Sequence, residues 1–314
     1  MRTIELMYPH ILQQQELPET VAAIGFFDGI HKGHQKVIKT AVSEAKKRGM
    51  ESAVITFHPH PSVVLKADAK DVKYITPIRE KQEILQQMNV DRLYLITFNK
   101  ELSGLSPQAF LDHFIIGLNI KHVVAGFDFT FGHKGKGNMQ TIGQLTRGFF
   151  THTVIDKVEY DAEKISSTKI RELLATGDVT TVQQLLGRPL YLHGTVIDGA
   201  KRGRKLGFPT ANLQFDSEIL LPKTGIYAVK VIYKNESYDA MASLGFNPTF
   251  HDENQQRTLE VNILDYSHDI YGKELKLEWY AFIREEKKFS SVEDLIEQMK
   301  KDEVQIRQYF KESH

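Results

Sequence analysis

The sequence predicts an α/β protein with two domains: a doubly wound parallel sheet at the N-terminus, and an antiparallel β-barrel with a terminal helix at the C-terminus. In residues 1–186, short apolar runs alternate with segments of helical periodicity, which is typical of a parallel sheet covered by helices. From residue 187 onward, short strands that alternate apolar and polar residues follow one another, separated by turn residues. This second pattern is typical of a small closed barrel. We therefore expect one domain at residues 1–186 and another at 187–314.

The composition argues against several classes of protein. The 314 residues contain 40 Lys and Arg and 40 Asp and Glu, so the formal net charge is zero, whereas nucleic-acid binding usually needs a basic surface. The sequence contains no cysteine, which excludes disulfides and thiolate metal sites. Its start does not resemble a secretion signal, and no apolar run is long enough to cross a membrane. We expect a cytoplasmic protein that binds neither nucleic acid nor membrane.

The stretch Gly25–His34, which reads GFFDGIHKGH, organises the first domain. It follows a predicted strand at Val21–Ile24 and precedes helical spacing at Val37–Ala45. A turn from a strand into a helix is where α/β sheets bind ligands, and the N-terminus of the helix attracts anions. His31 and His34 could donate hydrogen bonds to a phosphate there. Two histidines three residues apart are also common as surface residues, and less often as metal ligands, so the pair alone does not establish a site.

Four more strands and two more helix starts are expected in the first domain. The predicted strands are Ser52–Phe57, Arg92–Phe98, His122–Phe127 and Thr151–Ile155. Helices should begin at Thr76-Pro77 and Ser106-Pro107, because proline suits the first helical position. The two prolines of His58–Pro61 should leave a loop at the end of their strand.

Two later segments of the first domain also carry polar residues next to predicted strands or helices. A glycine-rich loop with Asp128 follows the strand at His122–Phe127, and by itself it is equally well explained as an ordinary turn. The string ISSTKIR, residues 165–171, places hydroxyl groups where a helix begins. Hydroxyl groups at that position are most often helix caps.

The first domain is expected to end with a helix at Val179–Leu186, and the second to contain a barrel followed by a terminal helix. The predicted strands of the barrel are Tyr191–Val196, Tyr227–Tyr233, Tyr238–Leu244, Leu259–Leu264 and Leu275–Ile283. The chain should end in one amphipathic helix, or in two that are broken near Asp302. Within the barrel, Lys201–Leu213 reads KRGRKLGFPTANL, and it is not a Walker A loop because no G-K-[ST] follows at the required spacing.

Three motifs, in this order along the chain, resemble those of the bacterial bifunctional riboflavin kinase/FMN adenylyltransferases. FDGIHKGH and ISSTKIR resemble the two signatures of the nucleotidylyltransferase superfamily, and GFPTAN resembles the P-T-A-N signature of riboflavin kinases. The resemblance covers essentially the whole chain. It implies an FMN adenylyltransferase domain at residues 1–186 and a riboflavin kinase domain at 187–314.

The resemblance also implies roles for particular residues. His31 and His34 would stabilise the triphosphate during catalysis, Glu260 would be the catalytic base, and Thr210 and Asn212 would ligate Mg²⁺. Nucleotide and flavin contacts are implied at Gly25, Phe26, Asp28, Gly29, Gly33, Asp128, Ser166, Ser167, Thr168, Arg171, Gly207, Pro209, Thr210 and Asn212. Asp128 stands where some relatives carry Asn. Without the resemblance, a glutamate in an alternating strand would be taken for a solvent-facing residue.

The implied function is the phosphorylation of riboflavin to FMN by ATP, followed by adenylylation of FMN to FAD with release of pyrophosphate. Riboflavin, FMN and ATP would be the substrates and Mg²⁺ the cofactor. One alternative is a nucleotidylyltransferase for another phosphorylated acceptor, fused to an unrelated barrel, against which the P-T-A-N motif argues. Another is a flavin-binding regulator with reduced catalysis, against which the intact motifs argue. The sequence does not indicate an oligomeric state.

Overall fold

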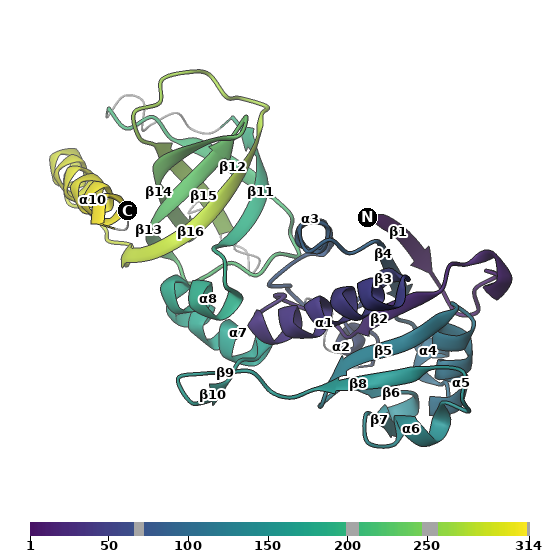
Figure 1. Cartoon of the computed structure of the whole chain (residues 1–314). Coiled ribbons are helices and arrows are strands. Elements are labelled where there is room, and N and C mark those ends of the chain that lie inside the picture. Colours follow the sequence, from purple (N-terminus) through teal and green to yellow (C-terminus); the bar gives the residue numbers. More distant parts are fainter. Residues whose placement is uncertain (66–71, 199–206, 247–256, 313–314) are drawn as a thin grey trace. The chain divides into compact units, whose positions relative to one another are not determined.

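The computed structural model describes residues 1–65, 72–198, 207–246 and 257–312 (Figure 1). The chain divides into two compact units, Met1–Ser167 and Thr168–His314. Helices α7 (Ser167–Thr176) and α8 (Val179–Leu186) therefore fall almost entirely in the second unit, whereas the sequence analysis places them in the first domain. The functional boundary at residue 187 stays a prediction.

The first unit contains a parallel sheet, as predicted, and the sheet has six strands where five were expected. Their order in space is β1 (Arg2–Leu6), β4 (Arg92–Thr97), β3 (Glu51–His58), β2 (Thr20–Ile24), β5 (Ile120–Gly126) and β8 (Thr151–Ile155). All neighbouring pairs are parallel. The sequence analysis missed the edge strand β1, whose five residues RTIEL include only one buried side chain, that of Leu6.

The main helices lie between the strands at the predicted places. They are α1 (Lys32–Arg48), α3 (Ile78–Gln87) and α5 (Pro107–Leu111), the last continuing as the π-helical segment η2 (Asp112–Ile116). Helix α1 packs on β2, β3 and β5 and ends at Gly49, whose φ of 66° is left-handed. A five-residue helix, α2 (Pro61–Leu65), begins where a loop was expected. That expectation was wrong at Pro61, because proline is tolerated in the first turn of a helix.

Short elements fill the remaining connections of the first unit. They are η1 (Gln14–Glu16), α4 (Lys100–Ser103), β6 (Thr130–Phe131), η3 (His133–Gly135), β7 (Gly137–Asn138), α6 (Ile142–Leu145), β9 (Glu159–Tyr160) and β10 (Glu163–Lys164). The glycine-rich loop after β5 thus folds into the small β6–β7 hairpin.

The strand order identifies the ligand-binding edge of the sheet. From β2 the chain builds outward through β3 and β4, then returns to the other side of β2 as β5 and continues to β8. Ligands in such sheets bind outside the carboxyl ends of the strands where the order reverses. Those strands are β2, which is followed by Gly25–His34, and β5, which is followed by the glycine-rich loop.

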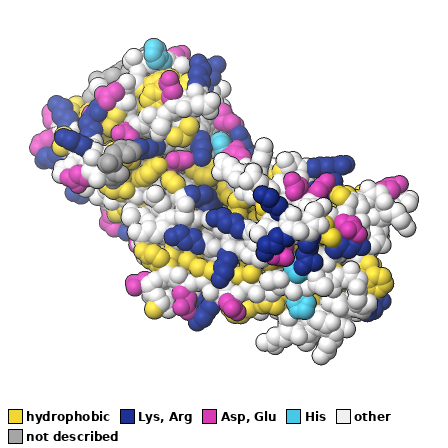
Figure 2. All heavy atoms as spheres, viewed as in Figure 1, with side chains coloured by type: hydrophobic (Ala, Val, Ile, Leu, Met, Phe, Trp, Pro, Cys, Tyr) yellow, Lys and Arg dark blue, Asp and Glu magenta, His cyan; other side chains and the backbone are white. Residues whose placement is uncertain are grey.

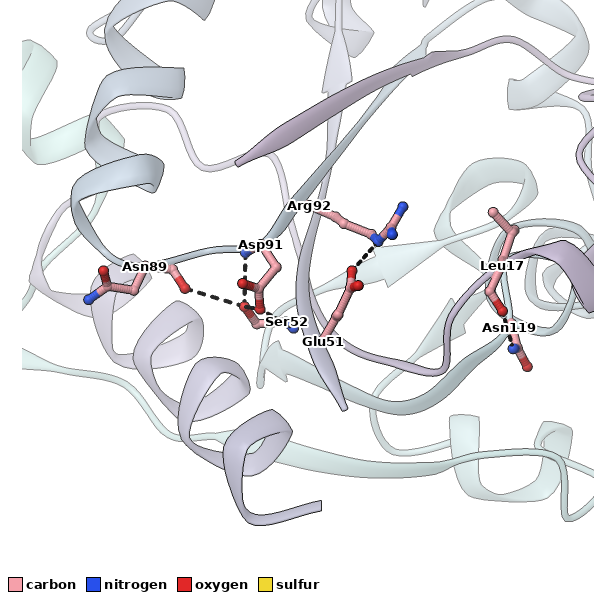
Figure 3. A network of polar contacts seen from close by, with 7 residues as sticks. All are labelled: Leu17, Glu51, Ser52, Asn89, Asp91, Arg92 and Asn119. Atoms are coloured by element: carbon pink, nitrogen blue, oxygen red, sulfur yellow. Dashed lines mark hydrogen bonds and ion pairs between the residues drawn. The ribbon is translucent and has the colours of Figure 1, made fainter. Parts of the chain in front are cut away.

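The opposite edge of the sheet is closed by side chains that bond to one another (Figure 3). The hydroxyl group of Ser52 donates to Asp91 Oδ2 at 2.7 Å and accepts from the Asp91 backbone N–H at 3.0 Å. Arg92 pairs with Glu51 beside them. Because these polar groups satisfy one another at the amino ends of β3 and β4, we assign them a structural role.

The second unit is built on a closed antiparallel barrel, as predicted, and the barrel has six strands where five were expected. Their order is β11 (Leu190–Ile197), β12 (Ala211–Phe215), β15 (Arg257–Ile263), β14 (Glu236–Phe246), β13 (Gly225–Tyr233) and β16 (Glu274–Arg284). The interior holds the largest side chain, that of Trp279, edge-on to Tyr227 with ring centroids 4.9 Å apart. Strand β12 was not predicted as a strand, because its five residues directly follow the turn that contains Pro209.

Helices α7 and α8 are bonded to the barrel. The backbone N–H of Lys223 donates to the carbonyl of Leu174 at 2.8 Å, and the hydroxyl of Thr180 donates to the carbonyl of Tyr280 at 3.1 Å. Helix α8 also lies against β11 and β16. The compact second unit is thus a barrel together with these two helices.

A single helix, α10 (Val292–Glu312), ends the described chain, so the alternative of two helices does not hold. Asp302 is 1% exposed, and the guanidinium group of Arg284 donates to its carboxylate at 2.7–3.0 Å. Ile306 and Phe310 cluster with barrel residues and with Phe208, which belongs to the GFPTAN motif. Helix α10 therefore covers part of the barrel and shares a hydrophobic cluster with the start of that motif.

The surface shown in Figure 2 carries Lys, Arg, Asp and Glu side chains interspersed with hydrophobic and neutral ones. This agrees with the equal numbers of acidic and basic residues in the sequence.

Candidate functional site

The histidine pair at the start of α1 is held by a helix cap. His31 Nδ1 accepts a hydrogen bond from the backbone N–H of His34 at 3.2 Å, and the two rings stack with centroids 3.6 Å apart. A Cβ at Gly33 would lie 3.0 Å from His31 Cε1, so a larger residue would displace the capping ring. The cap therefore requires a histidine three residues before His34 and a glycine at position 33.

The turn before the pair has an unusual backbone. Phe27, Gly29 and Ile30 all have positive φ angles, of 53°, 88° and 42°. L-residues rarely adopt this region, and burial of the Phe27 and Ile30 side chains offsets the cost. At Gly25 a Cβ would lie 2.9 Å from the Phe27 ring, so this position also requires a small residue.

Asp28 joins the turn to two other segments. Its carboxylate, in a residue only 3% exposed, accepts from the backbone N–H of Thr76 at 3.1 Å. Its carbonyl accepts from the hydroxyl group of Ser167 at 2.8 Å. The first and second signature motifs thus meet at this hydrogen bond, which gives Ser167 a positioning role, while its phosphate contact stays a prediction.

The electrostatics of the turn keep His34 neutral. Burial lowers the pKa of His34 well below its usual value, and the nearby His31, Lys81 and Lys164 lower it further. His34 Nδ1 is buried and has no hydrogen-bond partner among the described residues. A neutral imidazole carries one N–H donor, so His34 can offer a hydrogen bond to a phosphate without carrying a charge.

Lys81 is a residue at this edge of the sheet that the sequence analysis missed. It is 1% exposed on α3, and its ammonium group donates to the carbonyl of Phe26 at 2.9 Å. Burial lowers the pKa of Lys81 to about 8, although Asp28 acts in the opposite direction. The sequence signal that could have identified Lys81 is its position on the apolar face of the helix, three residues before Ile84.

Asp128, in the glycine-rich loop, forms an ion pair. Lys164 Nζ lies 2.6 Å from Asp128 Oδ2 and 4.8 Å from the centroid of the Phe127 ring. Both charged side chains are about half exposed, so the pair can open to admit a ligand at little cost. A nucleotide contact of Asp128 stays a prediction, as do the roles of Ser166, Thr168 and Arg171. Thr168 and Arg171 belong to the second unit.

In the barrel, the structure brings together the three residues to which the sequence analysis gave catalytic and metal roles. Asn212 on β12 lies directly opposite Glu260 on β15, and the hydroxyl group of Thr210 donates to Glu260 Oε2 at 3.3 Å. Glu260 is exposed because the strand alternates and its neighbours Leu259 and Val261 fill the interior. The three side chains form a cluster of oxygen donors on the outer surface of the barrel.

The motif that carries this cluster is anchored on both sides. Phe208 is 7% exposed and packs in the cluster that includes Ile306 and Phe310 of α10. Asn262 Nδ2 donates to the carbonyl of Pro209 at 2.8 Å. Asn262 was missed by the sequence analysis, although it lies two residues after Glu260 on the same strand. Residues 201–206 of the expected loop lie outside the described residues, and the ligand contacts expected of Gly207 and Pro209 stay predictions.

The cluster suits a magnesium ion that is shared with a substrate. In the part of the chain that the structure describes, no group of three or more His, Cys, Asp and Glu side chains could hold a metal by itself. Mg²⁺ in phosphoryl-transfer sites uses one or two protein oxygens and completes its shell with phosphates and water. The oxygens of Thr210 and Asn212, beside Glu260, fit that pattern.

A histidine-capped turn lies where the parallel sheet reverses its strand order, and a cluster of hard oxygen donors lies on the barrel. This combination fits a two-domain transferase that acts on phosphate groups. The FAD synthetase family model matches residues 13–169, and the riboflavin kinase family model matches residues 186–310. The chain belongs to the family of bifunctional riboflavin kinase/FMN adenylyltransferases.

Relatives in several bacteria support this assignment. The chain is 46% identical over 310 residues to the bifunctional riboflavin kinase/FMN adenylyltransferase of Listeria monocytogenes, covering 99% of this chain and 98% of the relative. It is 44% identical over 311 residues to the protein of the same name in Bacillus subtilis, with the same coverage.

A solved structure from Streptococcus pneumoniae, described as a macrolide-efflux protein, is also similar. It superimposes with a TM-score of 0.88 at 36% identity, over 98% of this chain and 99% of that one. Among the residues described for the present chain, no helix is both long enough and apolar enough to cross a membrane.

Proposed function

We infer that this chain makes FAD from riboflavin in two ATP-dependent steps, one in each domain. The barrel phosphorylates riboflavin to FMN, and the parallel-sheet domain transfers an adenylyl group from ATP to FMN. Family membership over nearly the full length supports both steps. The structural observation that best supports the kinase step is the hydrogen bond between Thr210 and Glu260, because it puts a carboxylate base beside a predicted Mg²⁺ ligand. For the adenylyltransferase step it is the stacked pair of His31 and His34 at the start of α1.

In the kinase step, Glu260 takes the proton from the ribityl 5′-hydroxyl group as its oxygen attacks the γ-phosphorus of ATP, giving FMN and ADP. Thr210 orients the Glu260 carboxylate through its hydrogen bond. Thr210 and Asn212 would hold Mg²⁺, which when bound supplies positive charge to the phosphates. The exposure of Glu260 leaves it accessible to the substrate.

In the adenylyltransferase step, a phosphate oxygen of FMN attacks the α-phosphorus of a second ATP, and pyrophosphate leaves. The phosphate of FMN is ionised at neutral pH, so no general base is needed. The neutral His34 offers an N–H donor to charge that develops on the phosphates, and His31 fixes its position by stacking. The N-terminus of α1 adds its partial positive charge at the same place.

Both steps are tested by separating the products after incubation with riboflavin, ATP and Mg²⁺. We expect FMN first and FAD later, and neither in excess EDTA. Tight flavin binding without turnover would instead support a regulator. Adenylylation of another phosphorylated acceptor, with neither FMN nor FAD formed, would support the other alternative. A cytoplasmic location and the lack of nucleic-acid partners stay predictions from the sequence.

A further inference from the structure

Lys81 is a buried lysine that neither reaction, as derived above, uses directly. It shares the buried face of α3 with Ile84 and Leu85, a position where an apolar side chain would ordinarily lie. Burying an ammonium group costs several kcal/mol unless hydrogen bonds and an opposite charge compensate. Packing alone therefore does not explain why a lysine lies at this position.

The contacts of Lys81 explain its burial, because they converge on the Gly25–His34 turn. Lys81 Nζ donates to the Phe26 carbonyl at 2.9 Å and lies 3.4 Å from Thr56 Oγ1, which itself donates to the same carbonyl at 2.8 Å. The ammonium also lies 5.1 Å from the centroid of the Phe26 ring. Two donors from α3 and β3 thus hold one carbonyl at the start of the turn that leads to His31 and His34.

The charge of Lys81 also reaches the turn. The charged and titratable groups that face it are Asp28, within the turn, and His34, in the first turn of α1. Asp28 compensates the ammonium, and the ammonium disfavours a second positive charge on His34. A neutral side chain at position 81 would leave Asp28 without this compensation and would ease protonation of His34.

We propose that Lys81 is a positioning residue for adenylyl transfer: its buried ammonium fixes the Gly25–His34 turn through the Phe26 carbonyl and adds positive charge that favours the anionic transition state. This rests on the adenylyltransferase function proposed above. The barrel contains none of these contacts, so the kinase step of the same protein is an internal control.

The first test compares Lys81→Met, which keeps the length of the side chain but removes the charge, with Lys81→Arg and with Lys46→Met on the exposed face of α1. We expect Lys81→Met to lower kcat for FAD formation by about 10²-fold, as for a misplaced catalytic group, with a smaller change in KM for ATP. Lys46→Met should keep both activities. All variants should phosphorylate riboflavin at the wild-type rate.

The second test is the pH profile, which a merely structural lysine would not affect. Because the pKa of Lys81 is about 8, wild-type kcat for FAD formation should fall above that pH as the charge is lost, while the kinase rate should not fall there. Lys81→Arg should retain its activity at higher pH, because a guanidinium group stays protonated. Lys81→Met should lack the fall altogether.

The outcomes separate this inference from the proposed function. If the wild-type protein makes no FAD, the proposed function fails. If it does, a Lys81→Met variant with wild-type kcat and an unchanged alkaline fall overturns the role of Lys81. Should Lys81→Met not fold, the comparison of wild type with Lys81→Arg decides, since identical alkaline profiles for the two would equally overturn it.

Discussion

The hydroxyl of Thr210 and the carboxylate of Glu260 share a hydrogen bond of 3.3 Å, although they are 50 residues apart in the sequence. The bond forms because β12 pairs with β15, which sets Asn212 opposite Glu260 and leaves Thr210 one step before the strand. The pairing of β12 with β15 therefore fixes the distance between the GFPTAN motif and Glu260.

Glu260→Gln should slow riboflavin phosphorylation strongly while leaving the adenylylation of added FMN unchanged. The amide is nearly isosteric but cannot accept the proton, so the kinase rate should fall by about 10²–10⁴. Product analysis with riboflavin and with FMN as separate substrates measures the two effects. Glu218→Gln, at an exposed residue next to β12, is the matched control. A Glu260→Gln variant with wild-type kinase rate would show that Glu260 is an ordinary surface residue.

His34→Ala should slow FAD formation by roughly 10²–10³, the usual loss for one preorganised donor, and should leave phosphorylation intact. FMN would then accumulate in a time course started with riboflavin. Because the pKa of His34 lies well below 6.5, the imidazole should remain neutral at pH 6.5, where an ordinary histidine is half protonated. An NMR titration of His34 with a midpoint near 6.5 would contradict the assigned protonation state.

A fragment that begins at residue 168 should fold more stably than one that begins at residue 187. The longer fragment keeps α7 and α8, whose contacts to Lys223 and Tyr280 the shorter one loses. Removing α8 would also expose the barrel surface that Val182 and Leu186 help to cover. Thermal unfolding of both fragments, with riboflavin kinase assays, checks this. Equal stability would mean that the two helices contribute nothing to the second unit, and an inactive but folded longer fragment would mean that the kinase site borrows residues from the first unit.

Asp302→Ala should destabilise the second unit by about 3–5 kcal/mol, because it leaves the guanidinium of Arg284 buried without its partner. The kinase should be lost at lower denaturant concentration than the adenylyltransferase, since α10 packs in the same hydrophobic cluster as Phe208 at the start of the GFPTAN motif. Arg307→Met, which removes exposed pairs with Asp265 and Glu303, is the control and should cost at most about 1 kcal/mol. Similar losses in the two variants would refute this account.

The architecture could be predicted from the sequence because the apolar runs of a parallel sheet and the alternation of a barrel leave clear patterns. Strand β1 was not predicted because an edge strand has few buried apolar side chains. Strand β12 was not predicted because it is short and follows a proline. The spacing of His31 and His34 could be interpreted locally, since a helix cap joins them.

Other parts of the site depend on contacts between distant segments. The helical spacing places Lys81 on the apolar face of its helix, but its contacts with Phe26 and Thr56, which show what it does there, join segments far apart in the sequence. Likewise, Asn262 reaches the carbonyl of Pro209 because of the register between two paired strands, which no single motif specifies. The residues at which local patterns failed are those whose partners lie far away along the chain.

Closure of the barrel also has a consequence for the order in which the protein matures during synthesis. Strand β11 pairs with β16, so that Leu190 lies opposite Trp279, and the ring of strands cannot close until β16 has left the ribosome. The parallel sheet, complete at Ile155, can fold well before then. We expect nascent chains to acquire the site for the second reaction first, and the site for the first reaction only after β16 has emerged.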